Sequence, residues 1–401
     1  MTISIAESND FEQAIADWLS ANCPASMRLP MPSEEAVWGG RKETFPIDGS
    51  RHWLERMADK GLLAPTWPVA YGGAGFSREQ EKILQRQMLK QGCRPALMSL
   101  GIHMMGPTIM EFGSEAQKRE HLPKIARGEV RWCQGYSEPG AGSDLASLKC
   151  RAEKDGDHYI VNGQKVWTSF ADQSDFIFCL VRTDFTAAKH EGISVLLIDL
   201  DSPGVSVRPI ELISGSSHFS EVFFDNVPVP VANLLGEENQ GWPIAKRMLQ
   251  HERNMMGQRD MGDTYNPDLA DVARRYLGEQ NGRVGDAVLR DQIAANRMQM
   301  HAVEVTSARV LQEFKAGVIG AGSSVLKTAM TLAYQEKFEL LLTLMGHKAL
   351  GWYAEGNEAA FTDEEMRSAK EWAFSKIQTI GGGTTEIQLN IIAKRILNLP
   401  D

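Results

Sequence analysis

The sequence has few of the features that mark membrane, nucleic-acid-binding or secreted proteins. None of its 401 residues lies in an apolar run approaching the roughly 18 residues of a membrane-spanning helix, so no membrane span is expected. The net charge is −10, and Lys and Arg form no cluster that could neutralise phosphates, which argues against nucleic acid as a partner. The N-terminal residues lack a basic stretch followed by an apolar one. We therefore expect no secretory signal and a cytoplasmic location.

Cysteine is scarce, and the five cysteines are odd in number and widely spaced, without a Cys-x-x-Cys pair. This pattern predicts free thiols in a reducing compartment rather than a disulfide framework. A zinc motif is incomplete, because His251 and Glu252 are followed by Met255 where the second His would be needed. We therefore expect no metal site.

The composition, with 43% hydrophobic and 23% charged residues, indicates a soluble globular protein. A chain of 401 residues is longer than one hydrophobic core usually accommodates, so two or three domains are expected. Residues 8–130 have helical periodicity. Within them, residues 80–112 are apolar and rich in methionine, which predicts helices buried in a bundle rather than on its surface. We assign residues 1–130 to an N-terminal α-helical domain.

The composition changes near residue 131 to that of short β-strands. Residues 158–167 are predicted to form a hairpin, because Asn162 and Gly163 can supply the two positive φ angles of a tight turn. Dense short strands of this kind predict a small β-barrel or sandwich, which we assign to residues 131–240. The further strands are expected at residues 175–181, 193–198, 205–208 and 221–224.

Helical periodicity returns after Gly241 and continues to about Leu397. We assign residues 241–401 to a C-terminal α-helical bundle domain. The chain is therefore expected to be an α+β multidomain protein with the order α, β, α. The long periodic stretches are residues 248–256, 293–314, 325–345 and 369–377.

Residues 132–144 have the chemistry of a loop that holds an anion or a polar heterocycle. Pro139 fixes one backbone angle, and Gly140 and Gly142 allow positive φ and leave backbone N–H groups accessible. Taken alone, the same residues are more typical of an ordinary surface turn. A second segment, Lys165–Ser169, follows about 25 residues later, and the two segments gain meaning together.

The two segments resemble the flavin-contacting segments of the acyl-CoA dehydrogenase family. The resemblance implies the family architecture, with an N-terminal α domain, a central β domain and a C-terminal four-helix bundle. It covers almost the whole chain, except for roughly residues 257–300. The further matching segments, in the family's order, are Leu62–Pro68, Tyr71–Gly75, Glu221–Pro228, Gly236–Trp242 and Gly381–Gln388.

The resemblance implies an FAD cofactor and the residues that hold it. On the first segment these are Gln134, Tyr136 and Ser137, at the pyrimidine edge of the flavin, with Ser143 further along. The second segment lies along the isoalloxazine ring in the family. Its residues here are Trp167, Thr168 and Ser169, and the start of the last helix adds Thr384 and Glu386.

The resemblance also implies a reaction in which a carboxylate removes a proton from the carbon next to an acyl thioester, and a hydride passes from the following carbon to flavin N5. In the commonest family pattern the base precedes the last helix, but here Gly382 stands at that position. Its backbone N–H is implied as a donor to the thioester oxygen. Ser143, Arg253, Gly382 and Gly383 match positions that contact the acyl-CoA substrate.

Glu252 is the candidate base, because a subset of the family has its Glu immediately before an Arg on the helix that follows the β domain. Helical spacing supports this, since Ala245, Leu249, Glu252 and Met256 share one face. A carboxylate on an apolar stripe is expected to have a raised pKa. The alternatives are that Glu252 pairs with a neighbouring cation or lies at the edge of the stripe in solvent.

The sequence therefore predicts an FAD-dependent acyl-CoA dehydrogenase that forms a 2,3-enoyl-CoA as a homodimer or homotetramer. Electron-transferring flavoprotein is the acceptor that the resemblance implies. Two alternatives remain: a non-catalytic subunit of a mixed oligomer, suggested by Gly382, or a flavin enzyme of the same fold with other chemistry such as oxygenation. The glycines at 381–383 leave space for a branched or bulky acyl group.

Two segments depart from the family pattern. Asn281–Gly285 replaces an Arg-x-x-Phe-Gly segment that reaches the FAD diphosphate, and Thr343–His347 replaces a Gln-x-x-Gly-Gly segment. No residue is assigned to the adenosine end of FAD for this reason.

Overall fold

The computed structural model describes residues 10–256, 265–315, 322–353 and 360–400. They divide into two compact units, which are described one at a time. The first unit holds residues 1–210 and 218–264, and the second holds residues 211–217 and 265–401. Helices, strands and helices follow one another along the chain as predicted. The domain boundaries at residues 130 and 240 stay a prediction.

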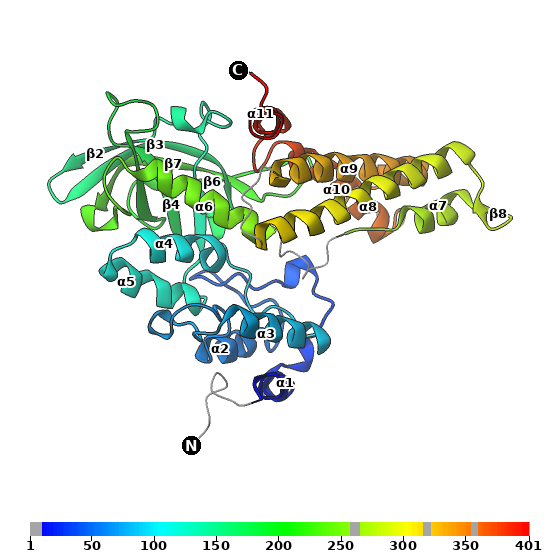
Figure 1. The fold of residues 1–401 in the computed structure, drawn as a ribbon, viewed down its shortest axis with the longest axis horizontal. Coiled ribbons are helices and arrows are strands. Elements are labelled where there is room, and N and C mark those ends of the chain that lie inside the picture. Colours follow the sequence, from blue (N-terminus) through cyan, green and yellow to red (C-terminus); the bar gives the residue numbers. More distant parts are fainter. Residues whose placement is uncertain (1–9, 257–264, 316–321, 354–359, 401) are drawn as a thin grey trace. The chain divides into compact units, whose positions relative to one another are not determined.

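The first unit begins with helices whose ends follow local signals. Ser77 and Ser114 form capping boxes with Gln80 and Gln117, in which each side chain satisfies a backbone N–H group at the start of the helix. The helices, shown in blue to cyan in Figure 1, are α1 (Phe11–Asn22), α2 (Ser50–Asp59), α3 (Arg78–Lys90), α4 (Gly106–Phe112) and α5 (Glu115–Ala126).

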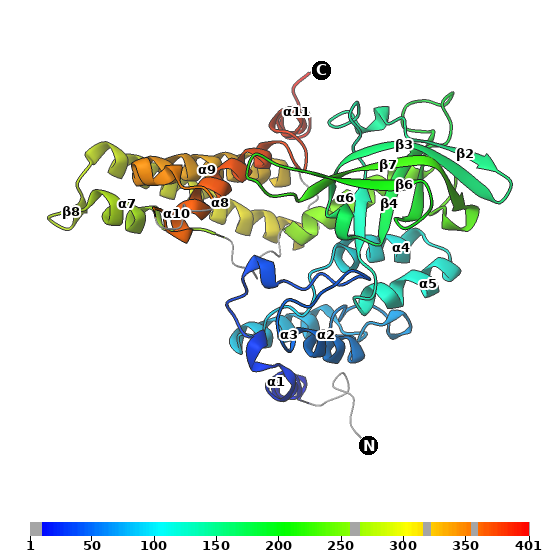
Figure 2. The same ribbon diagram turned by 180° about the vertical axis from the view of Figure 1, so that it is seen from behind.

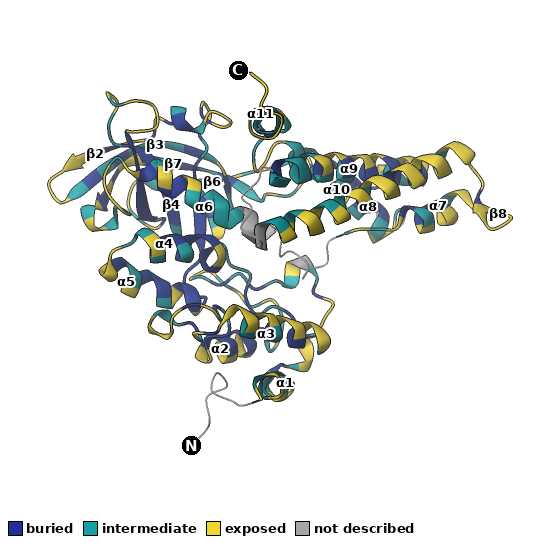
Figure 3. Ribbon diagram, in the orientation of Figure 1, coloured by how far each residue is buried: buried dark blue, intermediate teal, exposed yellow. Residues whose placement is uncertain are grey.

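The prediction that residues 80–112 form buried helices is correct for one part and wrong for the other. The turn Gly101–Met105 and the following α4 are largely buried. Helix α3 is instead an amphipathic surface helix, of which only Leu84, Gln87 and Met88 are buried (Figure 3). The prediction gave weight to the methionine and leucine residues of this segment and too little to its many charged residues, which face solvent.

The β part of the first unit is a single seven-stranded sheet (Figure 2). Its order is β1-β4-β2-β3-β7-β6, and β5 pairs with β4 on the other side. β4 runs parallel to β1 and β2, and the other pairs are antiparallel. The strands are β1 (Trp132–Gly135), β2 (Arg151–Asp155), β3 (His158–Ser169), β4 (Phe176–Arg182), β5 (Ile193–Asp199), β6 (Val205–Ile210) and β7 (Phe219–Pro230).

The predicted hairpin turn at Asn162 and Gly163 is wrong. Both residues lie inside the continuous strand β3, next to a shift of register against β7, and the chain turns earlier, at Gly156. Gly163 is needed for a different reason: a Cβ atom there would lie 2.7 Å from the Cα atom of Cys150. A close approach of two backbones, rather than a turn, requires the glycine.

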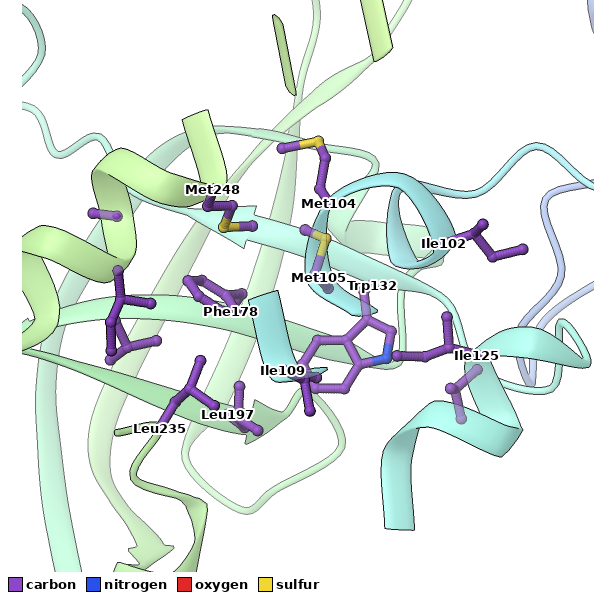
Figure 4. Packing of buried hydrophobic residues seen from close by; sticks show 14 of the residues in the cluster. Ile102, Met104, Met105, Ile109, Ile125, Trp132, Phe178, Leu197, Leu235 and Met248 are labelled. Carbon is purple, nitrogen blue, oxygen red and sulfur yellow. The ribbon is translucent and has the colours of Figure 1, made fainter. Parts of the chain in front are cut away.

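Both faces of the sheet contribute to a hydrophobic core. On one face, Trp132 and Phe178 pack with Ile109 and Ile125 from α4 and α5 (Figure 4). Cys133, Val161 and other residues form a second cluster. Strands buried on two faces read as nearly continuous apolar runs, as β4 and β5 do. All five cysteines are buried free thiols, as predicted.

The second unit is a helical bundle in which the other helices pack on α9. Its core includes Phe338, Leu341 and Leu344. A short hairpin that the sequence analysis did not predict turns at Asn281 and Gly282, both with positive φ. The elements are α7 (Leu269–Leu277), β8 (Glu279–Gln280), β9 (Arg283–Val284), α8 (Ala287–Lys315), α9 (Gly322–Met345), α10 (Asp363–Ser375) and α11 (Thr385–Arg395). In the described part of the chain, no helix is long and apolar enough to cross a membrane.

Candidate active site

The first predicted segment leaves β1 and makes a tight turn between Glu138 and Ala141, each of which donates its N–H to the carbonyl oxygen of the other at 3.0 Å. Gly140 and Gly142 allow positive φ, but neither adopts it here. A Cβ atom at either position would meet nothing within 4 Å. The turn therefore leaves open space beside its backbone. Ser143 is exposed in the same stretch.

The second predicted segment lies at the end of β3, where the pairing with β7 shifts register between Lys165 and Thr168. Trp167 occupies the irregularity with φ +60°, and 53% of its surface is exposed. A left-handed backbone angle is unusual for a bulky residue. Ser169 is half-buried, and Thr168, next to the exposed indole, is fully buried.

Buried polar atoms on both segments lack partners. Nε2 of Gln134 and Oγ1 of Thr168 have no hydrogen-bond partner of normal geometry among the described residues, and the same holds for Oγ of Ser220, which faces Thr168 on β7. A buried polar group without a partner costs about 1–3 kcal/mol, so such atoms are expected to meet a ligand or water. Their chemistry fits the polar edge of a flavin.

An ion pair that the sequence analysis did not identify joins the two segments. The fully buried Lys165 ammonium donates to Oε1 of Glu138 at 2.7 Å and to the carbonyl oxygen of Tyr136 at 3.2 Å. The Glu138 carboxylate also accepts from the backbone N–H groups of Lys149 at 2.7 Å and Cys150 at 2.9 Å. Burial acts to lower the pKa of Lys165, but neighbouring thiols and Glu138 hold that pKa above its ordinary value.

Strand alternation could have revealed this ion pair. In the alternating pattern of β3, Lys165 falls on the same face of the strand as Tyr159 and Val161, which are apolar core positions. A lysine at such a position needs a buried acidic partner.

Tyr136 connects the first segment to helix α6 (Gly241–Met256). Its buried hydroxyl donates to the carbonyl oxygen of Ala245 at 3.3 Å and lies 3.2 Å from the sulfur of Met248. Burial raises the pKa of Tyr136, the Gln134 side chain lowers it, and the negative charge of Glu252 raises it further. Glu252 is therefore close enough to act on this hydroxyl.

The helix face proposed to carry the base is largely as expected. Ala245 is buried, and Leu249 and Glu252 are half-buried. The side chains of Met256 and Arg253 lie outside the part of the chain that the structure describes. Helix α6 packs in the first unit, against β5, α4 and the turn Gly101–Met105. The raised pKa of Glu252 and its role as base stay predictions.

The remaining predicted residues belong to the second unit and precede α11. Gly382 and Gly383 have φ angles of +68° and +94°, and a Cβ atom at Gly382 would meet nothing within 4 Å. The Lys327 ammonium donates to the carbonyl oxygen of Gly383 at 2.6 Å. Thr384 caps α11 by accepting the N–H of Ile387 at 3.3 Å.

Glu386 is exposed in the first turn of α11. Its own backbone N–H and the Thr384 hydroxyl lower the pKa of its carboxyl group.

Family comparison matches the chain in three successive parts. The acyl-CoA dehydrogenase N-terminal domain matches residues 25–129, the middle domain residues 133–227 and the C-terminal domain residues 239–397. The last match includes residues 257–300, which the comparison of short motifs left out.

Individual relatives and solved structures agree. The chain is 32% identical to acyl-CoA dehydrogenase IpdE1 of Mycobacterium tuberculosis, over 98% of this chain and 97% of that protein. Its fold is similar to the Tcur3481-Tcur3483 steroid ACAD, with a TM-score of 0.72, 26% identity and coverage of 98% and 97%. It is also similar to the ChsE4-ChsE5 complex from M. tuberculosis, with a TM-score of 0.69, 31% identity and coverage of 88% and 90%.

Proposed function

Because the chain belongs to the acyl-CoA dehydrogenase family, we propose that it is an FAD-dependent enzyme that converts an acyl-CoA thioester to the 2,3-enoyl-CoA. The observation that supports the cofactor is a pair of buried polar atoms, Gln134 Nε2 and Thr168 Oγ1, one on each segment. Neither has a hydrogen-bond partner of normal geometry among the described residues. FAD would supply the hydride acceptor. Gln134, Tyr136, Ser137, Trp167, Thr168 and Ser169 would hold its ring. Ser143, Thr384 and Glu386 are proposed as further cofactor contacts on the strength of the family resemblance.

Glu252 is the proposed base that takes the proton from the carbon next to the thioester. It lies on a helix face with the buried Ala245 and the half-buried Leu249, which suits a base that works away from bulk water. Tyr136 ties the same helix to the proposed flavin segment, which supports a fixed position for the carboxylate.

Gly382 is proposed to contribute its backbone N–H to the thioester oxygen. A donor placed toward the oxygen on which charge develops stabilises the enolate-like transition state. Arg253 and Ser143 are proposed to bind the CoA part, and Gly383 to line the acyl side. These roles rest on the family resemblance and on the open space around Gly382.

A branched or bulky acyl group is the proposed substrate class. The absence of a side chain at Gly382, with open space around it, supports this choice. One structural relative is described as a steroid acyl-CoA dehydrogenase, which is consistent with a large substrate.

The proposed partners are further subunits of the same enzyme and electron-transferring flavoprotein as the electron acceptor. The proposed location is the cytoplasm. A homodimer or homotetramer is the simplest assembly. Gly382 favours a second candidate function, the silent subunit of a mixed oligomer, and a relative solved as the ChsE4-ChsE5 complex makes a mixed assembly a specific alternative.

Anaerobic titration tests these proposals. The purified protein is expected to show a flavin spectrum that bleaches with branched or steroid-type acyl-CoAs more readily than with short straight ones. Bound flavin that no acyl-CoA bleaches would favour the silent subunit, and absence of flavin would reject the dehydrogenase. A clear preference for short straight chains would reject the substrate class.

A further inference from the structure

The buried pair of Lys165 and Glu138 has no role in the proposed chemistry, and folding stability does not explain it. Removing two charges from water costs about as much free energy as their attraction returns, so an apolar pair would serve the fold equally well. Each charge is nevertheless fully bonded: Lys165 contacts Glu138 and the Tyr136 carbonyl, and Glu138 accepts two backbone N–H groups besides. This arrangement fixes backbone positions in three separate stretches of the chain.

The strained backbone beside Lys165 indicates what is being fixed. Trp167 has φ +60° in the irregular part of β3, and Phe170 follows with φ +54°. Bulky residues keep such angles only where surrounding contacts determine them, and such strain gathers at functional sites. Two contacts hold the start of the irregularity: Val166 N–H donates to the Ser137 carbonyl at 2.9 Å, and the Lys165 ammonium donates to the Tyr136 carbonyl.

We propose that Lys165 and Glu138 are positioning residues, which lock residues 134–138 against residues 165–169 so that Gln134, Thr168 and the strained Trp167 present one preformed flavin surface. The inference rests on the proposed FAD function and deepens it. Neither residue needs to touch the cofactor. The pair acts by keeping the surface ordered before FAD binds, which reduces the entropy lost on binding.

The test replaces both charges at once, with Lys165→Met and Glu138→Gln in one chain. The Gln amide oxygen can still accept one of the two backbone N–H groups that Glu138 accepts, and no unpaired buried charge remains. The matched control is Lys149→Met. It removes a lysine charge from an exposed side chain and keeps the Lys149 backbone N–H that donates to residue 138. Both variants are compared with the wild type in thermal midpoint, in amide hydrogen exchange of residues 165–169 of the apoprotein, and in FAD dissociation constant.

The double variant is expected to stay folded at a lower thermal midpoint, because the Tyr136 carbonyl and one of the two backbone N–H groups lose their partners. It is expected to exchange the amides of Val166 and Trp167 about tenfold faster and to bind FAD at least about tenfold more weakly. Lys149→Met is expected to match the wild type in all three. Wild-type exchange rates and FAD affinity in the double variant would overturn the proposal. Equal weakening of FAD binding in Lys149→Met would also overturn it, because loss of a surface charge would then explain the effect.

Amide exchange separates this proposal from the proposed function. If the wild-type protein binds no FAD, the proposed function fails, while exchange in the apoprotein still decides whether the pair orders residues 165–169. If the double variant does not fold, Lys165→Gln with Glu138→Gln keeps two amides that can hydrogen bond to each other. That variant is expected to bind FAD more weakly than the wild type, and unchanged affinity would overturn the proposal.

Discussion

The hydroxyl of Tyr136 donates a hydrogen bond to the carbonyl oxygen of Ala245 across 3.3 Å. This bond ties the segment that follows β1 to helix α6, one face of which carries Glu252. The proposed flavin segment and the proposed base are therefore linked through a single buried phenol, and Glu252 is close enough for its charge to raise the pKa of Tyr136.

Tyr136→Phe is expected to lower the free energy of unfolding by about 1 kcal/mol, because one buried hydrogen bond is lost while the Ala245 carbonyl stays within its helix. Denaturant titration measures the change. Tyr71→Phe is the control, since it removes a hydroxyl that donates to the exposed Glu115, and a change within about 0.5 kcal/mol is expected. Equal losses in the two variants would show that the Tyr136 hydroxyl has no special structural role.

Gly163→Ala is expected to destabilise the β-sheet by about 3 kcal/mol, because the new methyl group would lie 2.7 Å from the Cα atom of Cys150 and neither backbone can move freely. Gly156→Ala is the control: its φ is +60° and its surroundings are open, so a cost of about 1 kcal/mol is expected. Thermal unfolding compares the two. A smaller loss at position 163 than at position 156 would contradict the close approach.

The two Asn-Gly pairs show what the sequence could and could not predict about the fold. Local chemistry is the same at Asn162–Gly163 and at Asn281–Gly282, yet only the second pair makes a hairpin turn. In β3 the pairing with β7 continues on both sides of the first pair and overrides the local preference. The order of helices and strands was predictable because it follows from hydrophobic periodicity, which does not depend on distant partners.

The candidate site divides in the same way. Motif order identified the segments that contain Gln134 and Thr168, and the structure shows that both carry buried polar atoms in need of a partner. The Lys165–Glu138 pair was missed, although both residues lie in or beside those motifs. Alternation along β3 marks Lys165 as buried, but its partner lies 27 positions earlier in the chain, and no local spacing identifies that partner.

Acid is expected to destabilise the second unit through Glu365. Burial acts to raise the pKa of this carboxyl group, but the Thr362 backbone N–H and the Tyr276 hydroxyl, at 2.7 and 2.9 Å, bring the pKa below its ordinary value. A depressed pKa contributes stability above the ordinary value of 4.5, and that stability is lost as pH falls through the folded-state pKa.

Thermal midpoints measured from about pH 7 to about pH 3 check this expectation. Glu365→Gln is expected to lower the midpoint near neutral pH and to make it less dependent on pH in the acid range. Parallel pH curves for the variant and the wild type would show that Glu365 contributes nothing to acid sensitivity.

Gly382→Glu is expected to reduce kcat/KM for branched or bulky acyl-CoAs about tenfold more than for straight ones, because a side chain would occupy the open space at this position. Gly382→Ala is the control, since it carries only the cost of the φ angle of +68°, about 1 kcal/mol. Steady-state kinetics with matched straight and branched substrates provide the comparison. An equal loss on both substrates would argue against a role for Gly382 in substrate choice.

The identity of the base is the central claim, and stopped-flow reduction of the bound flavin by acyl-CoA without oxygen tests it most directly. The control is Glu111→Gln, which alters a carboxylate that pairs with Arg247 of α6 at 2.6 Å and lies outside the proposed chemistry. Glu252→Gln is predicted to slow flavin bleaching by roughly 10²- to 10⁴-fold with FAD still bound, while Glu111→Gln bleaches at nearly the wild-type rate. Bleaching of Glu252→Gln at the wild-type rate would contradict the assignment of Glu252 as the base.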